Sequence, residues 1–135
     1  MSARRIEVCP DAVHLPGYLT LDAQRALAER CRAIGTGPTG WYVPTVRGGG
    51  KMRVRMVCLG RHWNARTYRY EAVRSDHDGK PAPALSPDLA ALASGMAAAA
   101  GMRLFPDVCI LNCYGPDGKM GLHQDKDEHP ETLVA

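Results

Sequence analysis

The sequence contains no apolar run that approaches the length of a membrane span, and its first residues, Met-Ser-Ala-Arg-Arg-Ile-Glu, lack the apolar stretch of a secretory signal peptide. It also contains no internal repeat and no low-complexity block. Hydrophobic residues still make up 45% of the 135 residues, which is too many for a disordered chain, and a chain of this length can bury a core. These features predict one cytoplasmic domain with no membrane partner.

The sequence also lacks a disulfide or zinc pattern. Its five cysteines are an odd number, and none has Cys-x-x-Cys spacing. Three of them lie in apolar runs that are typical of strands. We therefore expect reduced, buried thiols rather than disulfides or a zinc knuckle. The cysteines are Cys9, Cys31, Cys58, Cys109 and Cys113.

The net charge of only +3 hides an uneven distribution. Within residues 44–74, eight basic residues accompany one acidic residue, Glu71, and Trp63, Tyr68 and Tyr70 are interleaved with them. Cations that neutralise phosphate beside rings that stack on bases are typical of a single-stranded nucleic-acid surface. A solvated basic face whose aromatic rings belong to the core is the alternative. The basic residues are Arg47, Lys51, Arg53, Arg55, Arg61, Arg66, Arg69 and Arg74.

Helix signals occur twice. Residues 12–15 form a short predicted strand, and Thr20 is the predicted N-cap of a helix that runs to about Ile34, with Gly35 as a left-handed C′ residue. The predicted apolar stripe of this helix is Ala23, Ala26, Leu27, Cys31 and Ile34. A second helix is expected to begin at Ser86 as N-cap, with Pro87 at its first position, and to end near Gly101.

Two strands are predicted from alternation of side chains. Residues 52–59 alternate apolar and basic side chains, which places Arg53 and Arg55 on a solvent-exposed face. Residues 108–114 are predicted to form a buried strand. Between them, residues 74–87 are rich in Pro, Asp and Ser and are expected to form a long surface loop.

The segment from Leu111 to Glu128 is the most informative. His123 and Asp125 are two residues apart, so on an extended backbone their side chains leave the same face and can converge on one ion. An imidazole and a carboxylate are two of the three ligands of the facial triad that holds non-haem Fe(II). Asn112 and Tyr114 share the same spacing, so an amide and a phenol face one pocket; a turn-capping amide and a core ring are the alternatives.

The combination of Asn-x-Tyr, a Gly-Pro-Asp-Gly turn and Leu-His-Gln-Asp-Lys-Asp-Glu closely resembles the signature of the AlkB family of Fe(II) and 2-oxoglutarate dioxygenases. Similarity extends upstream through residues 52–60, the Tyr68-Arg69-Tyr70 triplet and the Asp78-Gly79-Lys80-Pro81 turn, and covers roughly residues 40–128. The resemblance implies an α+β double-stranded β-helix, or jelly roll, with N-terminal helices packed on the sheet and an incomplete C-terminal side.

The same resemblance implies how the 135 residues are organised as one AlkB-like domain. An N-terminal strand and helix occupy about residues 1–40, a nucleotide-recognition region about 41–80, a helix about 86–101, and the start of the jelly-roll core with the metal motif about 107–135.

Roles are implied for the residues that match the motif. His123 and Asp125 are the matching iron ligands and catalytic residues, and Asn112 and Tyr114 match the positions that hydrogen-bond 2-oxoglutarate. The implied substrate-binding residues are Asp127 against the target base, Lys126 near the nucleic-acid backbone, Tyr68 at a phosphate, Trp63 stacked on the flipped base, and Tyr70.

The implied activity is oxidative dealkylation of N-alkylated bases with Fe(II), 2-oxoglutarate and O₂, as in the repair of alkylated DNA. The substrate is single- or double-stranded DNA, or RNA, and the full-length enzyme is expected to be a monomer. Because the target base must leave its stack, which costs a few kcal/mol in a duplex, single strands should be good substrates.

The family's second iron-binding His, and the two arginines that follow it, have no match before Ala135. This predicts the N-terminal part of a longer enzyme, or a truncated product with little activity alone. Two other classes stay open: a metal-independent single-stranded nucleic-acid-binding module or decayed gene product, and a zinc hydrolase. The hydrolase would need ligands beyond His123 and Asp125, and the only nearby candidates are Asp127 and Glu128.

Overall fold

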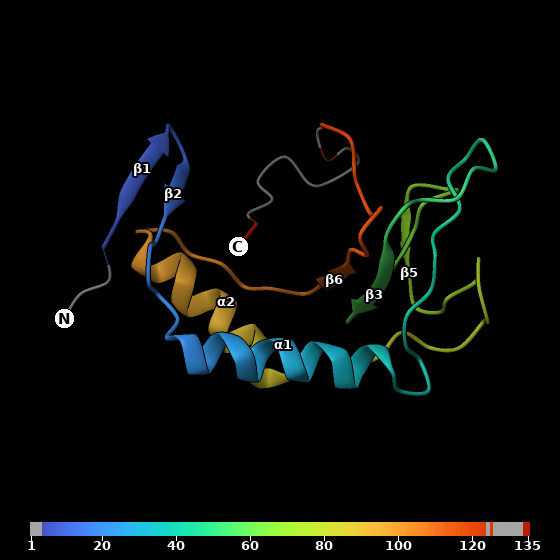
Figure 1. Ribbon diagram of the computed structural model, residues 1–135, viewed down its shortest axis with the longest axis horizontal. Helices are drawn as coiled ribbons and strands as arrows, with labels where there is room; N and C mark the ends of the chain where they lie inside the picture. Colours follow the sequence, from blue (N-terminus) through green and yellow to red (C-terminus); the bar gives the residue numbers. More distant parts are fainter. Residues whose placement is uncertain (1–3, 124, 126–133) are drawn as a thin grey trace. The chain divides into compact units, whose positions relative to one another are not determined.

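The computed structural model describes residues 4–123, 125 and 134–135 (Figure 1). The chain divides into two compact units: a first unit of residues 1–30, 86–106 and 133–135, and a second unit of residues 31–85 and 107–132. Neither helix that the structure describes is long and apolar enough to span a membrane.

The first unit contains a hairpin and two helices. β1 (Ile6–Cys9) pairs antiparallel with β2 (Ala12–His14), α1 runs over Leu21–Gly35 into the second unit, and α2 spans Pro87–Ala99. The Oγ1 of Thr20 accepts a hydrogen bond from the backbone N–H of Ala23 at 3.1 Å, which confirms the predicted N-cap.

The predicted start of α2 is confirmed, since Ser86 is its N-cap residue and Pro87 its first residue. The hydroxyl of Ser86, however, caps no helical N–H; it accepts a hydrogen bond from Nη2 of Arg30 at 2.6 Å, and Arg30 also pairs with Asp88. Two details predicted for α1 are wrong. Ala26 is exposed and lies outside the half-buried stripe of α1. Gly35 is the last residue of the helix rather than a left-handed residue after it, and the indole of Trp41 fills the space that a Cβ would need.

The second unit is built on two pairs of antiparallel strands. β3 (Arg55–Leu59) pairs with β6 (Cys109–Cys113), far along the sequence, in the register Met56↔Asn112 and Val57↔Leu111 (Figure 1). β4 (His62–Asn64) pairs with β5 (Arg69–Glu71) and sets Trp63 opposite Tyr70. Of the strand predicted over residues 52–59, only Arg55–Leu59 forms a regular β-strand.

A buried cluster of the second unit lies on one face of the β3 segment, while Val57 and Leu59 are buried on the other face. Tyr42, Val54, Met56 and Cys58 form a buried cluster, and Met52, Trp63 and Met120 pack against it. Arg53 and Arg55 point to solvent, as their alternation predicts. In β6, by contrast, only Leu111 is buried, so the strand predicted to be buried is covered on one face alone.

The segment from Arg74 to Pro87 is not wholly a surface loop. Gly79 has φ of 71°, as the predicted Asp78-Gly79 turn requires. Arg74, however, is only 2% exposed; its guanidinium donates to the carbonyl oxygens of Thr39 at 2.7 Å and Gly40 at 2.8 Å and to Asp78 at 3.1 Å. Its assignment to the basic surface is therefore wrong, while the other seven cations of residues 44–74 are exposed.

The five cysteines are free thiols, as predicted. Cys58 is buried and Cys31, Cys109 and Cys113 are half-buried. Cys9 is exposed, so the expectation of burial is wrong for this residue, which lies on the open hairpin strand β1.

Candidate active site

His123 and Asp125 come together on the segment that follows β6. The Nε2 atom of His123 lies 3.3 Å from Oδ1 of Asp125, and Nδ1 of His123 lies 2.7 Å from the carbonyl oxygen of Gly121. A carbonyl can only accept, so Nδ1 carries a proton and, in the neutral imidazole, the lone pair belongs to Nε2. This backbone contact selects the tautomer that a metal-binding imidazole needs.

The chemistry of this donor pair fits Fe(II). Imidazole nitrogen and carboxylate oxygen are both ligands of non-haem iron, and the side chains are 51% and 67% exposed, so an ion can reach them. Among the residues that the structure describes, no group of three His, Cys, Asp or Glu side chains is placed to hold a metal. Within the described residues, His123 and Asp125 are therefore the two candidate iron ligands.

Asn112 lies near the end of β6 and is exposed, and Tyr114, directly after the strand, is 48% exposed. Asn112 lies on the same face of the β3–β6 pair as its partner Met56, whose side chain belongs to the core. Neither side chain makes a hydrogen bond within the described part of the chain. Amide and phenol groups that are free and directed to the same side can bind the oxygen atoms of a small acid.

Three rings and a guanidinium form a second cluster on the β4–β5 hairpin. The ring centroid of Trp63 lies 5.0 Å from Tyr70 and 6.0 Å from Tyr68, and the guanidinium of Arg47 lies 4.9 Å over Tyr68. Trp63 is half-buried against the core, whereas Tyr68 is 42% exposed. Tyr68 therefore presents more free surface to a base than Trp63 does.

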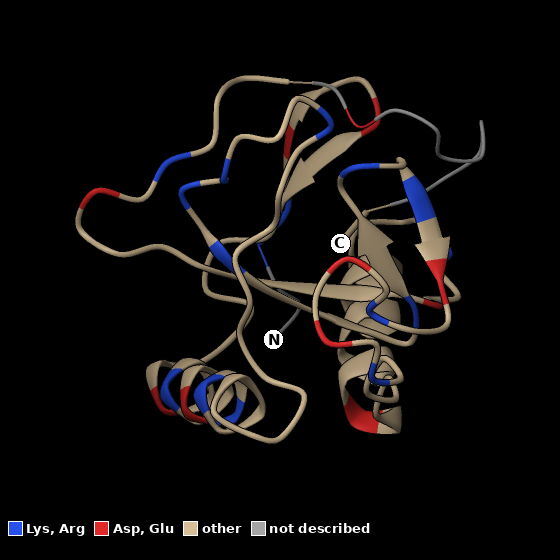
Figure 2. Cartoon of the chain, turned by 90° about the vertical axis from the view of Figure 1, so that its right-hand side faces the viewer, with Lys and Arg blue, Asp and Glu red and all other residues tan. Residues whose placement is uncertain are grey.

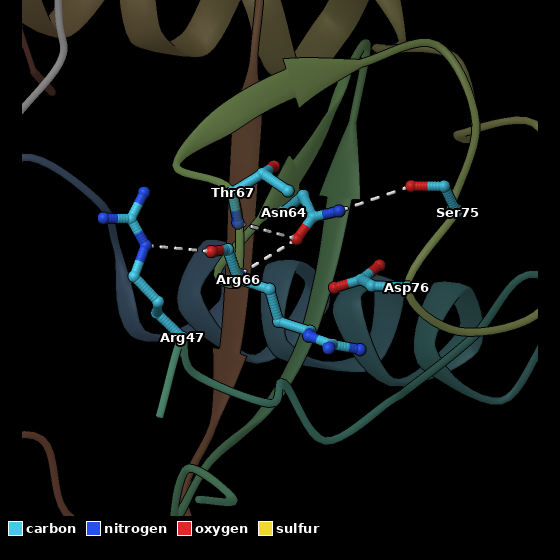
Figure 3. A pocket seen from close by; sticks show the side chains of 6 residues that line it. All are labelled: Arg47, Asn64, Arg66, Thr67, Ser75 and Asp76. Atoms are coloured by element: carbon cyan, nitrogen blue, oxygen red, sulfur yellow. Dashed lines mark hydrogen bonds between the residues drawn. The ribbon is translucent and has the colours of Figure 1, made fainter. Parts of the chain in front are cut away.

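The turn that carries Tyr68 is held by Asn64, a residue that the sequence analysis missed. The side chain of Asn64 is buried; its Oδ1 accepts the N–H groups of Arg66 at 2.9 Å and Thr67 at 3.3 Å, and its Nδ2 donates to Ser75 at 3.3 Å. Figure 3 shows these bonds at a cavity of about 360 Å³. An Asn just before a turn is the signal that could have revealed this role.

A buried hydrogen-bonded pair includes a residue of the same hairpin. Nε2 of His62 is 2.6 Å from Oδ1 of Asp76, and the two side chains are 1% and 3% exposed. Tyr42 packs against His62 with ring centroids 5.0 Å apart. Burial, together with the neighbouring Cys58, raises the pKa of Tyr42 above its ordinary value, so this phenol stays neutral. No spacing rule links His62 with Asp76, so neither residue was predicted from the sequence.

Lys126 and Asp127, which were predicted to contact the substrate, lie outside the described residues.

The distribution of charged residues along the described chain can be followed in Figure 2. Figure 2 shows Lys and Arg together with Asp and Glu along the strands and loops, and the helix seen end-on at the lower left, α1, also carries both signs.

A match to a known family covers nearly the whole chain. Residues 11–135 match the family described as the 2OG-Fe(II) oxygenase superfamily. The solved structure titled "The structure of OsALKBH1" superposes with a TM-score of 0.82 at 31% identity, over 94% of this chain and 63% of that chain. The chain therefore belongs to the 2OG-Fe(II) oxygenase superfamily and, within it, to the AlkB family. The similarity confirms the predicted jelly-roll class of fold, and membership implies Fe(II), 2-oxoglutarate and O₂ as metal and cosubstrates.

Curated relatives show the same family. The chain is 34% identical over 140 residues to "DNA N(6)-methyladenine demethylase ALKBH1C" of Arabidopsis thaliana, covering 92% of this chain and 30% of that protein. It is 36% identical over 131 residues to "Alpha-ketoglutarate-dependent dioxygenase AlkB homolog" of Caulobacter vibrioides, covering 95% of this chain and 57% of that protein. The chain thus spans less than two thirds of the length of each of these relatives.

Proposed function

We propose that this chain carries the iron site of a dioxygenase that removes alkyl groups from nitrogen atoms of nucleic-acid bases by oxidation. The observation that supports this most is the His123–Asp125 pair, with the Nδ1 proton of His123 bound by Gly121 and its Nε2 atom 3.3 Å from the carboxylate. In this proposal His123 and Asp125 hold Fe(II). When bound, the iron supplies the oxidation of the alkyl carbon by O₂, coupled to conversion of 2-oxoglutarate to succinate and CO₂.

Asn112 and Tyr114 are proposed to bind 2-oxoglutarate. Their spacing of two residues directs both side chains to one side of the chain at the end of β6, and within the described residues they have no competing hydrogen bonds. The amide can donate to a carboxylate oxygen and the phenol can donate to a second oxygen. This gives them a positioning role: they would orient the cosubstrate beside the iron ligands.

The substrate is proposed to be a base in single-stranded nucleic acid. Tyr68, Trp63 and Tyr70 supply rings on which a base can stack, and Arg47 supplies a cation beside them. Lys126 and Asp127 are retained as proposed substrate contacts on the sequence motif alone. Because ALKBH1C is named a DNA N(6)-methyladenine demethylase, N6-methyladenine in a DNA strand is the first substrate to test.

The test is demethylation of a methylated single-stranded oligonucleotide by the 135-residue chain, followed by mass spectrometry. We expect turnover that needs both Fe(II) and 2-oxoglutarate and that His123→Ala and Asp125→Ala abolish. We also expect it to be weak, because two protein ligands bind iron less tightly than three. Matching turnover in wild type and His123→Ala would rule out this iron site.

A metal-independent binding module is the second candidate. It is favoured by the same aromatic and basic cluster and by the presence of only two candidate metal ligands among the described residues. Binding of the oligonucleotide that neither chelator nor His123→Ala changes, with no turnover, would support it. The division into four segments, the cytoplasmic location and the monomeric state remain predictions.

A further inference from the structure

Four cations lie on one face of the second unit. Lys51, Arg53 and Arg55 occupy every second position of an extended segment, so their side chains point to the same side. Lys119 forms an antiparallel bridge with Arg53, in which the N–H of Lys119 donates to the carbonyl of Arg53 at 3.2 Å, so its side chain lies beside that of Arg53. All four residues are exposed. We refer to them as the cation row.

The opposite face of the same segment is the core face. Met52, Val54 and Met56 point there, and Trp63 packs against the same cluster. The cation row therefore points away from the side on which Trp63 and Asn112 lie. It is a separate surface from the proposed base-stacking cluster.

The charge of the cation row is not neutralised within the described residues. Arg53 and Lys119 make no side-chain ion pair there. Lys51 donates to the hydroxyl of Thr45 at 2.8 Å, and Arg55 lies 5.9 Å over the Trp41 ring and 3.3 Å from the Cys113 sulfur. None of these neighbours is an anion.

A groove of about 630 Å³ is lined by two residues of the row, Arg53 and Arg55. Its other lining residues are Val43, Met52, Val54, Cys113 and the turn at 115–118. Asp117 is the one acidic residue among its lining residues. An open groove with an excess of cations favours an extended anionic ligand.

We propose that the cation row binds the phosphodiester backbone of a nucleic-acid strand, beyond the nucleotide that lies at the aromatic cluster. Side chains that repeat every second residue of an extended segment are about 6.6 Å apart, which suits a ligand with regularly repeated charges. The planar guanidinium groups of Arg53 and Arg55 match phosphate oxygens better than single ammonium groups do. This inference rests on the proposed function for the class of substrate, but it requires no iron.

Salt dependence of binding tests the row directly. The 135-residue chain is titrated with an unmodified single-stranded oligonucleotide of about 16 nucleotides at several salt concentrations, without metal or 2-oxoglutarate. Each phosphate contact that is lost should reduce the slope of log K against log salt by about 0.7. We expect this reduction for Arg53→Gln and for Lys119→Gln, and about 1.4 for the double variant. At 0.1 M salt each single change should weaken binding about five-fold.

Two control variants make the result specific. Arg32→Gln removes an exposed arginine of α1 outside the row and should leave the slope unchanged. Arg53→Lys keeps the charge and should keep the slope. Equal slopes for wild type and the double variant, or the same loss in Arg32→Gln, would overturn the proposal. If polyglutamate displaces the bound oligonucleotide as well as free oligonucleotide does, the proposal is also overturned, and an acidic peptide is indicated as the partner.

The two proposals can fail independently. His123→Ala should abolish demethylation while leaving the salt slope unchanged. If the salt slope falls in the variants of the cation row but the wild type shows no turnover, the dioxygenase proposal is contradicted and the cation-row proposal stands. If the wild type shows turnover but the salt slope is unchanged in the variants of the cation row, only the cation-row proposal is contradicted.

Discussion

The Nε2 atom of His62 lies 2.6 Å from Oδ1 of Asp76 in the interior of the second unit, where the two side chains are 1% and 3% exposed. This pair ties β4 to the turn that follows Arg74. In the described residues, Nδ1 of His62 has no hydrogen-bond partner, so nearly all the polar stabilisation of this imidazole comes from Asp76.

Removal of one partner should therefore be costly. Asp76→Ala is expected to lower the free energy of unfolding by about 3 kcal/mol, because it leaves a buried imidazole without its acceptor. Urea unfolding of the two proteins measures the difference. The matched control is Asp22→Ala, which removes an exposed ion pair with Arg25 and should change stability little. Equal losses in both variants would contradict the importance of the buried pair.

Asn64 should support both stability and binding. Asn64→Ala removes the acceptor of two backbone N–H groups in the turn that carries Tyr68, and we expect a loss of about 1–3 kcal/mol in the free energy of unfolding. Affinity for single-stranded DNA should fall as well, because the ring of Tyr68 loses its fixed position. Thermal unfolding and fluorescence anisotropy give the two readouts. Unchanged affinity in a destabilised variant would limit Asn64 to a structural role.

Substitution of Tyr68 should affect stability and nucleic-acid binding differently. It adopts φ of 57°, a left-handed conformation that Asn tolerates better than Tyr. Tyr68→Asn should therefore leave stability unchanged or slightly raised, while binding of a single strand weakens by about 1–3 kcal/mol. Tyr68→Phe retains the ring and should retain most of the affinity. If Tyr68→Asn binds as tightly as wild type, no base stacks on this ring.

Alkaline pH should destabilise the core of the second unit. Burial raises the pKa of the Cys58 thiol above its ordinary value of 9.0, so above pH 9 the unfolded chain loses this proton while the folded chain keeps it. Stability should be constant near neutral pH and should fall above pH 9 by up to about 1.4 kcal/mol per pH unit for this group. Urea unfolding at pH 7 and pH 10 should show a smaller difference in Cys58→Ala than in wild type. The exposed Cys9 provides the control, because Cys9→Ser should keep the wild-type difference.

The features that depend on contacts between residues close in the sequence could be predicted. Thr20 was identified as an N-cap because the cap bond joins residues three apart, and the approach of His123 to Asp125 follows from their spacing on one face. The fold class could be predicted because the motif resembles a known family. Arg74 was misassigned because its acceptors, the carbonyls of Thr39 and Gly40, lie more than thirty residues away in the sequence.

The errors share one physical cause. Gly35 was predicted to be a left-handed residue after α1, but it ends the helix and the indole of Trp41 packs on it. The hydroxyl of the N-cap residue Ser86 binds the guanidinium of Arg30 instead of a helical N–H. The pair formed by His62 and Asp76 was missed for the same reason, since burial and distant partners leave no periodicity in the sequence. Composition and spacing alone do not encode such contacts.

Anaerobic calorimetric titration of Fe(II) in the presence of 2-oxoglutarate tests the central claim most directly, because it reports the metal site without requiring turnover. The account predicts weak saturable binding by the 135-residue chain, loss of that binding in His123→Ala and Asp125→Ala, and retention in His14→Ala, which removes an exposed imidazole of β2. Equal binding by wild type and His123→Ala would contradict the assignment of His123 and Asp125 as the iron ligands.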